Sequence, residues 1–191
     1  MTGRFEDLLA RVAVDAPQRE RERRLLTAEL AELREIGFGT WRVPAASGGS
    51  PIPLEEQFAR LIRLSAADAS LGHVWRGHLA FVESLRLQPI DQAQPWFDRV
   101  LAGDFVGNAQ SERHATAHLE TRIDRTSGEP LLSGTKYYTT GSIYADWIHL
   151  AALDGDERVA VTVSAHHPGV RSTDDWDGFG QLLTGSGTTV F

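Results

Sequence analysis

The chain has 191 residues, of which 41% are hydrophobic, and a net charge of −7 at pH 7. The hydrophobic fraction is sufficient for a packed core and excludes a disordered chain, while the negative charge argues against a nucleic-acid partner, whose phosphates require a basic surface. The absence of cysteine excludes disulfides and thiolate metal ligands. No apolar run approaches the length of a membrane span, and the first residues lack the apolar segment of a signal peptide, so we expect a cytoplasmic protein.

The first half of the chain carries helical periodicity throughout. One helix is predicted over residues 5–16, and Pro17 is expected to open a second helix that runs to about Ile36 and ends at Gly37. The charged run 19–24, near the start of this second helix, predicts a solvated helix face. Three further helices are predicted over 54–67, 70–87 and 89–102, each with apolar residues at helical spacing.

After Gly103-Asp104 the pattern changes to short runs of β-branched and aromatic residues, separated by turn signals. Strands are predicted over 105–109, 119–124, 130–133, 135–140, 147–153, 158–163, 170–173 and 188–191. Their spacing indicates a small antiparallel barrel or sandwich. The predicted fold class is therefore α+β, with an all-helical N-terminal domain at 1–104 followed by a β-domain at 105–191.

The stretch Gly134–Trp147 is the most informative part of the β-domain. Thr135–Thr140 is predicted to be a strand that Gly141-Ser142 interrupts, which leaves Tyr138 and Thr140 at the strand end. Hydroxyl groups there can donate to the heteroatoms of a flat ligand, and an aromatic ring can cover its face. An ordinary β-hairpin with a polar turn is the alternative for this stretch.

Five short segments stand in a distinctive order along the chain: 35–49, with Gly37-Phe38, Val43-Pro44 and Gly48-Gly49; 66–72; 108–112; 136–140; and 174–188. Their order resembles that of the acyl-CoA dehydrogenase superfamily. Lys136, Tyr138 and Thr140 fall on the family's Gly-x-Lys-x-aromatic-x-Thr/Ser segment, whose end lies beside the flavin. The last segment resembles one branch, the flavin-dependent monooxygenases related to dibenzothiophene monooxygenase.

This resemblance implies a helical N-terminal domain, a central β-domain and a C-terminal helical bundle. The chain offers no counterpart of that bundle, so we expect two of the three domains, with an exposed apolar face that includes Trp147, Ile148 and Val190. The family resemblance also implies a homo-oligomer for a full-length protein.

The function implied is that of a two-component monooxygenase. Such an enzyme takes reduced flavin, FMN or FAD, from a separate flavin reductase and uses oxygen on a small organosulfur or aromatic substrate. The alternatives are an acyl-CoA dehydrogenase and an inactive fragment that only binds or oligomerises. Residues 113–118 replace the Gly-Ser-Asp loop usual in dehydrogenases, which favours the monooxygenase, whereas Leu182 stands where that branch usually has an arginine.

The resemblance also implies the site residues. His78, Asn108 and Thr140 map to positions that face the flavin and oxygen, and Trp176 to a wall of the substrate pocket. The residues expected to contact the cofactor are Asn108, Ala109, Gln110, Ser111, Tyr138, Thr139 and Thr140. The residues alone favour the alternative that His78 is a helix histidine bonded to a backbone carbonyl, and Trp176 is equally well explained as the anchor of a surface loop.

Two histidines have the spacing of metal ligands on a helix. His114 and His118 lie four residues apart, but they fall in a predicted loop or strand with no obvious third ligand. We therefore expect no metal site.

Overall fold

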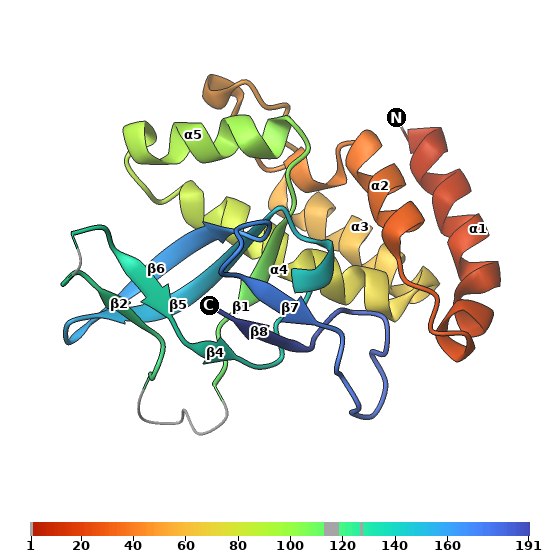
Figure 1. Ribbon diagram of the computed structural model, residues 1–191. Coiled ribbons are helices and arrows are strands. Elements are labelled where there is room, and N and C mark those ends of the chain that lie inside the picture. Colours follow the sequence, from red (N-terminus) through yellow and green to blue (C-terminus); the bar gives the residue numbers. More distant parts are fainter. Residues whose placement is uncertain (1, 113–118, 127) are drawn as a thin grey trace. The chain divides into compact units, whose positions relative to one another are not determined.

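The computed structural model describes residues 2–112, 119–126 and 128–191, which form two compact units (Figure 1). The helical unit comprises Met1–Phe105 together with Gly178–Thr184. The β unit comprises Val106–Asp177 together with Gly185–Phe191. Residues 113–118, which include both histidines of the spacing discussed above, lie outside the described residues.

The helical unit is built from helices joined by short connections, as the periodicity predicts. Its α-helices are α1 (Thr2–Arg21), α2 (Thr27–Glu35), α3 (Leu54–Ala67), α4 (Ala69–Leu85) and α5 (Ile90–Leu101), with 3-10 turns at Phe38–Thr40 and Ala45–Ser47. None of the described helices has both the length and the apolar character needed to cross a membrane.

The first helix boundary differs from the prediction. α1 continues through Pro17 to Arg21, and the break falls at Arg23, whose φ of 48° is left-handed. A proline inside a helix removes one backbone hydrogen bond and crowds the preceding turn. The helix continues because its apolar face is packed, with Leu8 and Val12 almost fully buried, and because Arg19 anchors the turn after Pro17.

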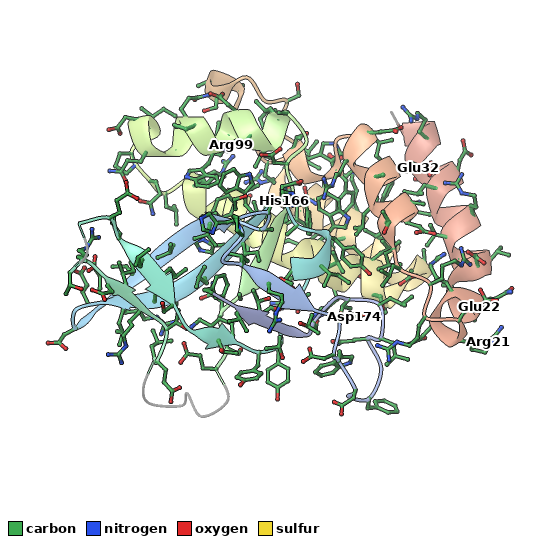
Figure 2. All side chains as sticks on the ribbon, in the orientation of Figure 1. Arg21, Glu22, Glu32, Arg99, His166 and Asp174 are labelled. Carbon is green, nitrogen blue, oxygen red and sulfur yellow. The ribbon has the colours of Figure 1, made fainter. Side chains whose placement is uncertain are left out.

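Arg19 corrects the expectation of a solvated charge run. It is 1% exposed, and its guanidinium lies 3.1 Å from Asp15, 3.1 Å from Glu29 and 3.3 Å from Asp68. The remainder of the run is exposed, and Figure 2 shows Arg21 and Glu22 at the outer end of α1. A buried guanidinium is tolerated only when carboxylates surround it, and here they come from α1, α2 and the residue before α4.

Local capping explains where several helices begin and end. Gly37 follows α2 with a φ of 77° and donates its N–H to the Arg34 carbonyl, as the predicted C-cap requires. Asp68 separates α3 from α4, and its Oδ1 accepts hydrogen bonds from the N–H groups of Ser70 (2.9 Å) and Leu71 (3.2 Å).

The core of the helical unit is aromatic. The Phe38 and Trp75 rings lie 5.2 Å apart, and Trp75 meets the Phe105 ring edge-on at 5.0 Å. The predicted inner residues Phe97 and Val100 of α5 are buried, whereas Leu101 is 37% exposed.

The β unit contains a five-stranded and a three-stranded sheet. The strands are β1 (Val106–Ala109), β2 (Arg122–Asp124), β3 (Leu131–Ser133), β4 (Thr135–Lys136), β5 (Trp147–Asp154), β6 (Glu157–Ser164), β7 (Arg171–Thr173) and β8 (Thr188–Val190). The larger sheet has the order β1-β5-β2-β3 with β6 also on β5, and the smaller has the order β4-β8-β7. The larger sheet is mixed, because β1 and β2 run parallel to β5, whereas antiparallel pairing throughout was expected.

Two local expectations in the β unit are wrong. The predicted strand 135–140 ends at Lys136, and β4 pairs with β8 instead of forming a hairpin with β5. Ile148, expected on an exposed apolar face, is fully buried, because the residues of β5 that alternate with Trp147 and His149 point into the core.

Candidate functional site

The end of β1 meets the turn that follows β4. The Asn108 N–H donates to the Thr140 carbonyl at 3.0 Å, so these two predicted site residues are adjacent. Asn108 is half-buried on the strand, and Thr140 is 6% exposed. The junction therefore presents an amide side chain next to a hydroxyl-bearing turn.

Tyr138 adopts an unusual backbone conformation in this turn. Its φ is 57°, a left-handed value that costs a bulky residue free energy and that often marks functional positions. Its ring is 58% exposed and meets the Trp176 ring edge-on, with 5.7 Å between centroids. The predicted cofactor residue Tyr138 and the predicted substrate residue Trp176 thus form one aromatic surface.

Thr139 lies beneath that surface and holds the turn in place. It is fully buried, and its Oγ1 lies 2.9 Å from Ser142 Oγ, 2.8 Å from Thr189 Oγ1 and 3.0 Å from the Gly187 carbonyl. Thr189 Oγ1 in turn lies 2.9 Å from Ser172 Oγ. This chain of hydroxyl groups ties the turn to β7 and β8, and the Thr139 side chain points into the protein.

Ser186 is a residue of this site that the sequence reasoning did not identify. Its Oγ lies 2.8 Å from the Thr140 Oγ1, and both residues are buried. Ser186 lies within the segment 174–188 that resembles the monooxygenase branch, but no role was assigned to it from the sequence. The sequence contains no signal that pairs a serine at 186 with a threonine at 140.

The residues after Asn108 continue along the same edge. Ala109 is fully buried, so only its backbone can take part in binding. The Gln110 Nε2 donates to the His149 carbonyl at 3.2 Å, and the Ser111 carbonyl accepts from the Tyr137 N–H at 2.9 Å. The predicted stretch from Asn108 to Ser111 is therefore held on both sides, by β5 and by the segment after β4.

A buried ion pair lies at the end of the Asn108–Ser111 stretch. The ammonium group of Lys136, which is the only lysine in the chain, lies 2.5 Å from the Glu112 carboxylate, and the two side chains are 0% and 4% exposed. Burial raises the pKa of Glu112, but the hydrogen bonds from Lys136 and from the N–H groups of Glu120 and Thr121 outweigh burial and lower that pKa to about 2. The pair fixes the end of the Asn108–Ser111 stretch to β4.

His149 lies beside Asn108 across the parallel β1–β5 pairing. Its Nδ1 is 2.9 Å from the Thr162 Oγ1 on β6, and burial lowers its pKa, so the neutral imidazole is favoured. Sequence reasoning placed His149 in a strand and assigned it no role.

His78 lies on α4 in the helical unit. It is 1% exposed, its Nε2 is 3.2 Å from the Gly39 carbonyl, and its ring stacks on Phe105 with 5.3 Å between centroids. The alternative given above, a helix histidine bonded to a backbone carbonyl, requires this contact. Because a carbonyl oxygen can only accept, Nε2 carries the proton. A side chain at Gly39 would force the His78 ring to shift, because its Cβ would stand 2.6 Å from that nitrogen.

Within the described residues, no group of three or more histidine, cysteine or acidic side chains is arranged to hold a metal ion. The polar groups gathered at the β1 junction are amides and hydroxyls with an aromatic ring beside them. Such a set suits a planar, heteroatom-rich ring.

The α+β architecture is that of acyl-CoA dehydrogenase-like flavoproteins, which confirms the predicted fold class. The chain is similar to an FMN-bound crystal structure of TdsC from Paenibacillus sp. A11-2, with a TM-score of 0.89 and 26% identity over 99% of this chain and 50% of that one. No family model matches the chain.

The curated relatives of the chain include monooxygenases and a CoA dehydrogenase. A probable FMNH2-dependent monooxygenase, SfnC, from Pseudomonas putida is 28% identical over 97% of this chain and 47% of its own length. A dibenzothiophene monooxygenase from Rhodococcus qingshengii is 27% identical over 92% of this chain and 45% of its own length. A benzylmalonyl-CoA dehydrogenase from Aromatoleum aromaticum is 31% identical over 81% of this chain and 42% of its own length.

These homologues confirm the family resemblance that the five segments indicated. The chain spans about half the length of the curated relatives it matches.

Proposed function

We propose that the chain is the helical and β portion of a two-component, flavin-dependent monooxygenase. It would take reduced flavin from a separate reductase and use oxygen on a small organosulfur or aromatic substrate. The observation that carries the proposal is the β1 junction, where Asn108 and Thr140 adjoin at 3.0 Å and Tyr138 and Trp176 form an aromatic surface. The similarity to SfnC, dibenzothiophene monooxygenase and TdsC supports it, and the FMNH2 dependence of SfnC and the FMN bound to TdsC favour FMN over FAD.

In domain terms, residues 1–104 would be the helical domain of this fold and residues 105–191 its central β-domain. The active protein would be a homo-oligomer. Both assignments rest on the resemblance to the superfamily.

The residues at the junction fit a flavin ring. Asn108 can donate and accept through its amide, Thr140 offers a hydroxyl, and Tyr138 offers an exposed ring face. The backbone of 109–111 would run along the pyrimidine edge. Reduced flavin, when bound, supplies the electrons with which oxygen is activated. The protein residues orient the ring, exclude water and place donors, which is the protein's part in such chemistry.

His78 would act on the oxygen side as a hydrogen-bond donor or acid. In its neutral form it donates Nε2–H to Gly39 and accepts at Nδ1, whereas in its protonated form both nitrogens donate. Trp176 would wall the substrate pocket beside Tyr138. Thr139 would act only by holding the turn.

A flavin titration tests the proposal. We expect FMN to bind the wild-type protein, and Asn108→Ala to weaken binding roughly 5- to 30-fold, as the loss of one or two hydrogen bonds predicts. Gln88→Ala is the matched control, because Gln88 is an exposed amide side chain between α4 and α5 in the helical unit. Equal affinity in the wild type and Asn108→Ala would remove Asn108 from the site. Absence of any flavin binding would favour a fragment that only binds or oligomerises.

The alternative is an acyl-CoA dehydrogenase. One relative is a benzylmalonyl-CoA dehydrogenase, but the monooxygenase relatives support the main proposal over this alternative. Product analysis separates the two. A monooxygenase consumes oxygen and transfers one of its atoms to the substrate, whereas a dehydrogenase forms an alkene from an acyl-CoA without oxygen uptake.

A further inference from the structure

One histidine of the β unit has no role in the function proposed above. His149 lies on β5, and the strand register places Asn108 of β1 on one side of it and Thr162 of β6 on the other. Residues that pair in register point to the same face of a sheet, so these three side chains form one row across three strands. We call them the polar row. At about 4.8 Å between neighbouring strands, the row spans roughly 10 Å.

The polar row lies on the outer face of the larger sheet. Its three side chains are half-buried. Ile148 and Leu150, which precede and follow His149 on β5, are fully buried and point to the opposite face, into the core. The row therefore retains access from outside the core, and a ligand can reach it.

The neighbours of His149 on this face suit a flat ligand. Trp147, two residues earlier on β5, is half-buried and points to the same face, where an indole ring can flank an aromatic ligand. Two residues after His149, Ala151 pairs with Ala160 of β6, so both side chains at that level are small. The row is thus bounded by an indole on one side and by two methyl groups on the other, which suits a planar ring laid over it.

The imidazole of His149 is held in one orientation. Its Nδ1 lies 2.9 Å from the Thr162 Oγ1, and the Gln110 Nε2 donates to its backbone carbonyl at 3.2 Å. The two nitrogens of an imidazole bond in diverging directions, so the contact with Thr162 turns Nε2 away from β6, and β1 lies on the opposite side of β5 from β6. Because burial lowers the pKa of His149, the ring is neutral, and the bond at Nδ1 decides whether Nε2 donates or accepts.

We propose that His149 is a further contact residue of the flavin site and hydrogen-bonds the flavin ring through Nε2, while Thr162 holds Nδ1. The ring then reaches from Asn108 across β1 onto β5. The polar row has about the length of a tricyclic ring system, and the flavin ring offers both donors and acceptors, so either tautomer of His149 finds a partner. Thr162 is a positioning residue, because it acts through His149. This assignment rests on the function proposed above and adds a residue that the family resemblance did not indicate.

FMN titration of His149 variants tests the contact. His149→Phe keeps an aromatic ring and removes both nitrogens, so it should weaken FMN binding roughly 3- to 10-fold. His149→Gln places an amide near the position of Nε2 and should recover most of the affinity. His166→Phe is the matched control and should leave the affinity unchanged, because the His166 side chain is 75% exposed in the turn after β6.

NMR of the imidazole rings tests the role of Thr162 without any flavin. Thr162→Val keeps the shape of the side chain and removes the hydroxyl group, so it should shift the ring nitrogen signals of His149 in the flavin-free protein and also weaken FMN binding. Thr162→Ser should restore both. When FMN is added to the wild-type protein, the ring signals of His149 should shift and those of His166 should not.

The outcomes separate this assignment from the proposed function. If Asn108→Ala weakens FMN binding and His149→Phe does not, the contact is overturned and the flavin site stands. If the wild-type protein binds no FMN, both are overturned. If His149→Gln binds as weakly as His149→Phe, the hydrogen bond at Nε2 is refuted. FMN that leaves the His149 signals of the wild type unchanged would overturn the contact even if no variant folds.

Discussion

Replacing Lys136 with methionine removes the positive half of a buried ion pair. Methionine keeps most of the length of the side chain and loses the charge, so the Glu112 carboxylate is left buried without its cation. The Glu112 side chain is 4% exposed, and the N–H groups of Glu120 and Thr121 alone would then compensate it. Removing one partner of a buried pair is strongly destabilising for this reason.

The magnitude follows from the pKa of Glu112. Folding lowers that pKa from 4.5 to about 2. At about 1.4 kcal/mol per pKa unit, the charged form of Glu112 contributes roughly 3 kcal/mol to the free energy of unfolding at neutral pH. Because the folded pKa is the lower one, this stability is complete above pH 4.5 and is lost as the pH falls from about 4.5 toward 2. Lys136→Met should remove a large part of it, roughly 2–3 kcal/mol at pH 7.

Urea unfolding followed by circular dichroism, repeated between pH 7 and pH 2, measures this effect. Glu112→Gln provides the reference, because the other acidic groups still titrate in that variant. The difference in stability between wild type and Glu112→Gln should shrink below pH 4.5. The double variant Glu112→Gln with Lys136→Met should be more stable than Lys136→Met alone, since neither charge is then left unpaired. A loss of less than about 1 kcal/mol in Lys136→Met at pH 7 would refute the reasoning.

Three further predictions concern the site. Thr140→Val should weaken FMN binding about 2- to 10-fold, because it removes one hydrogen bond to the flavin. Ser186→Ala removes the hydroxyl that pairs with Thr140 Oγ1 and should weaken FMN binding less. Fluorescence titration measures both affinities. Tyr138→Gly should leave the free energy of unfolding unchanged or raise it by about 1 kcal/mol, since glycine accepts the left-handed φ, while FMN affinity falls. Gly39→Ala should cost roughly 1–3 kcal/mol of stability and shift the NMR signals of His78, because the new methyl group would displace that ring; unchanged signals would contradict the contact.

Much of the secondary structure could be predicted from local signals. α3 has the predicted bounds, and Gly37 caps α2 as expected, because helical periodicity and capping depend on residues within a few positions of one another. Each predicted strand has a counterpart, since β-branched runs between turn residues are also a local pattern. The error at Pro17 arose because tertiary packing outweighed a local cost.

The site was predicted only in part. Asn108 and Thr140 were named through the family resemblance, and the structure places them side by side. Ser186 was not named, because no local pattern connects it with Thr140 across the intervening strands. The ion pair of Glu112 with the chain's single lysine was missed for the same reason.

The sequence by itself determined the α+β class, the order of helices and strands, the family resemblance and the candidate residues, because each depends on composition, spacing or motif. Only the tertiary structure decided which residues meet. It placed β1 and β2 parallel to β5, it buried Arg19 among three carboxylates, and it turned the apolar stripe of α3 outward. Periodicity shows that a helix has an apolar face, but which side of the helix the rest of the chain covers depends on packing between segments far apart in sequence.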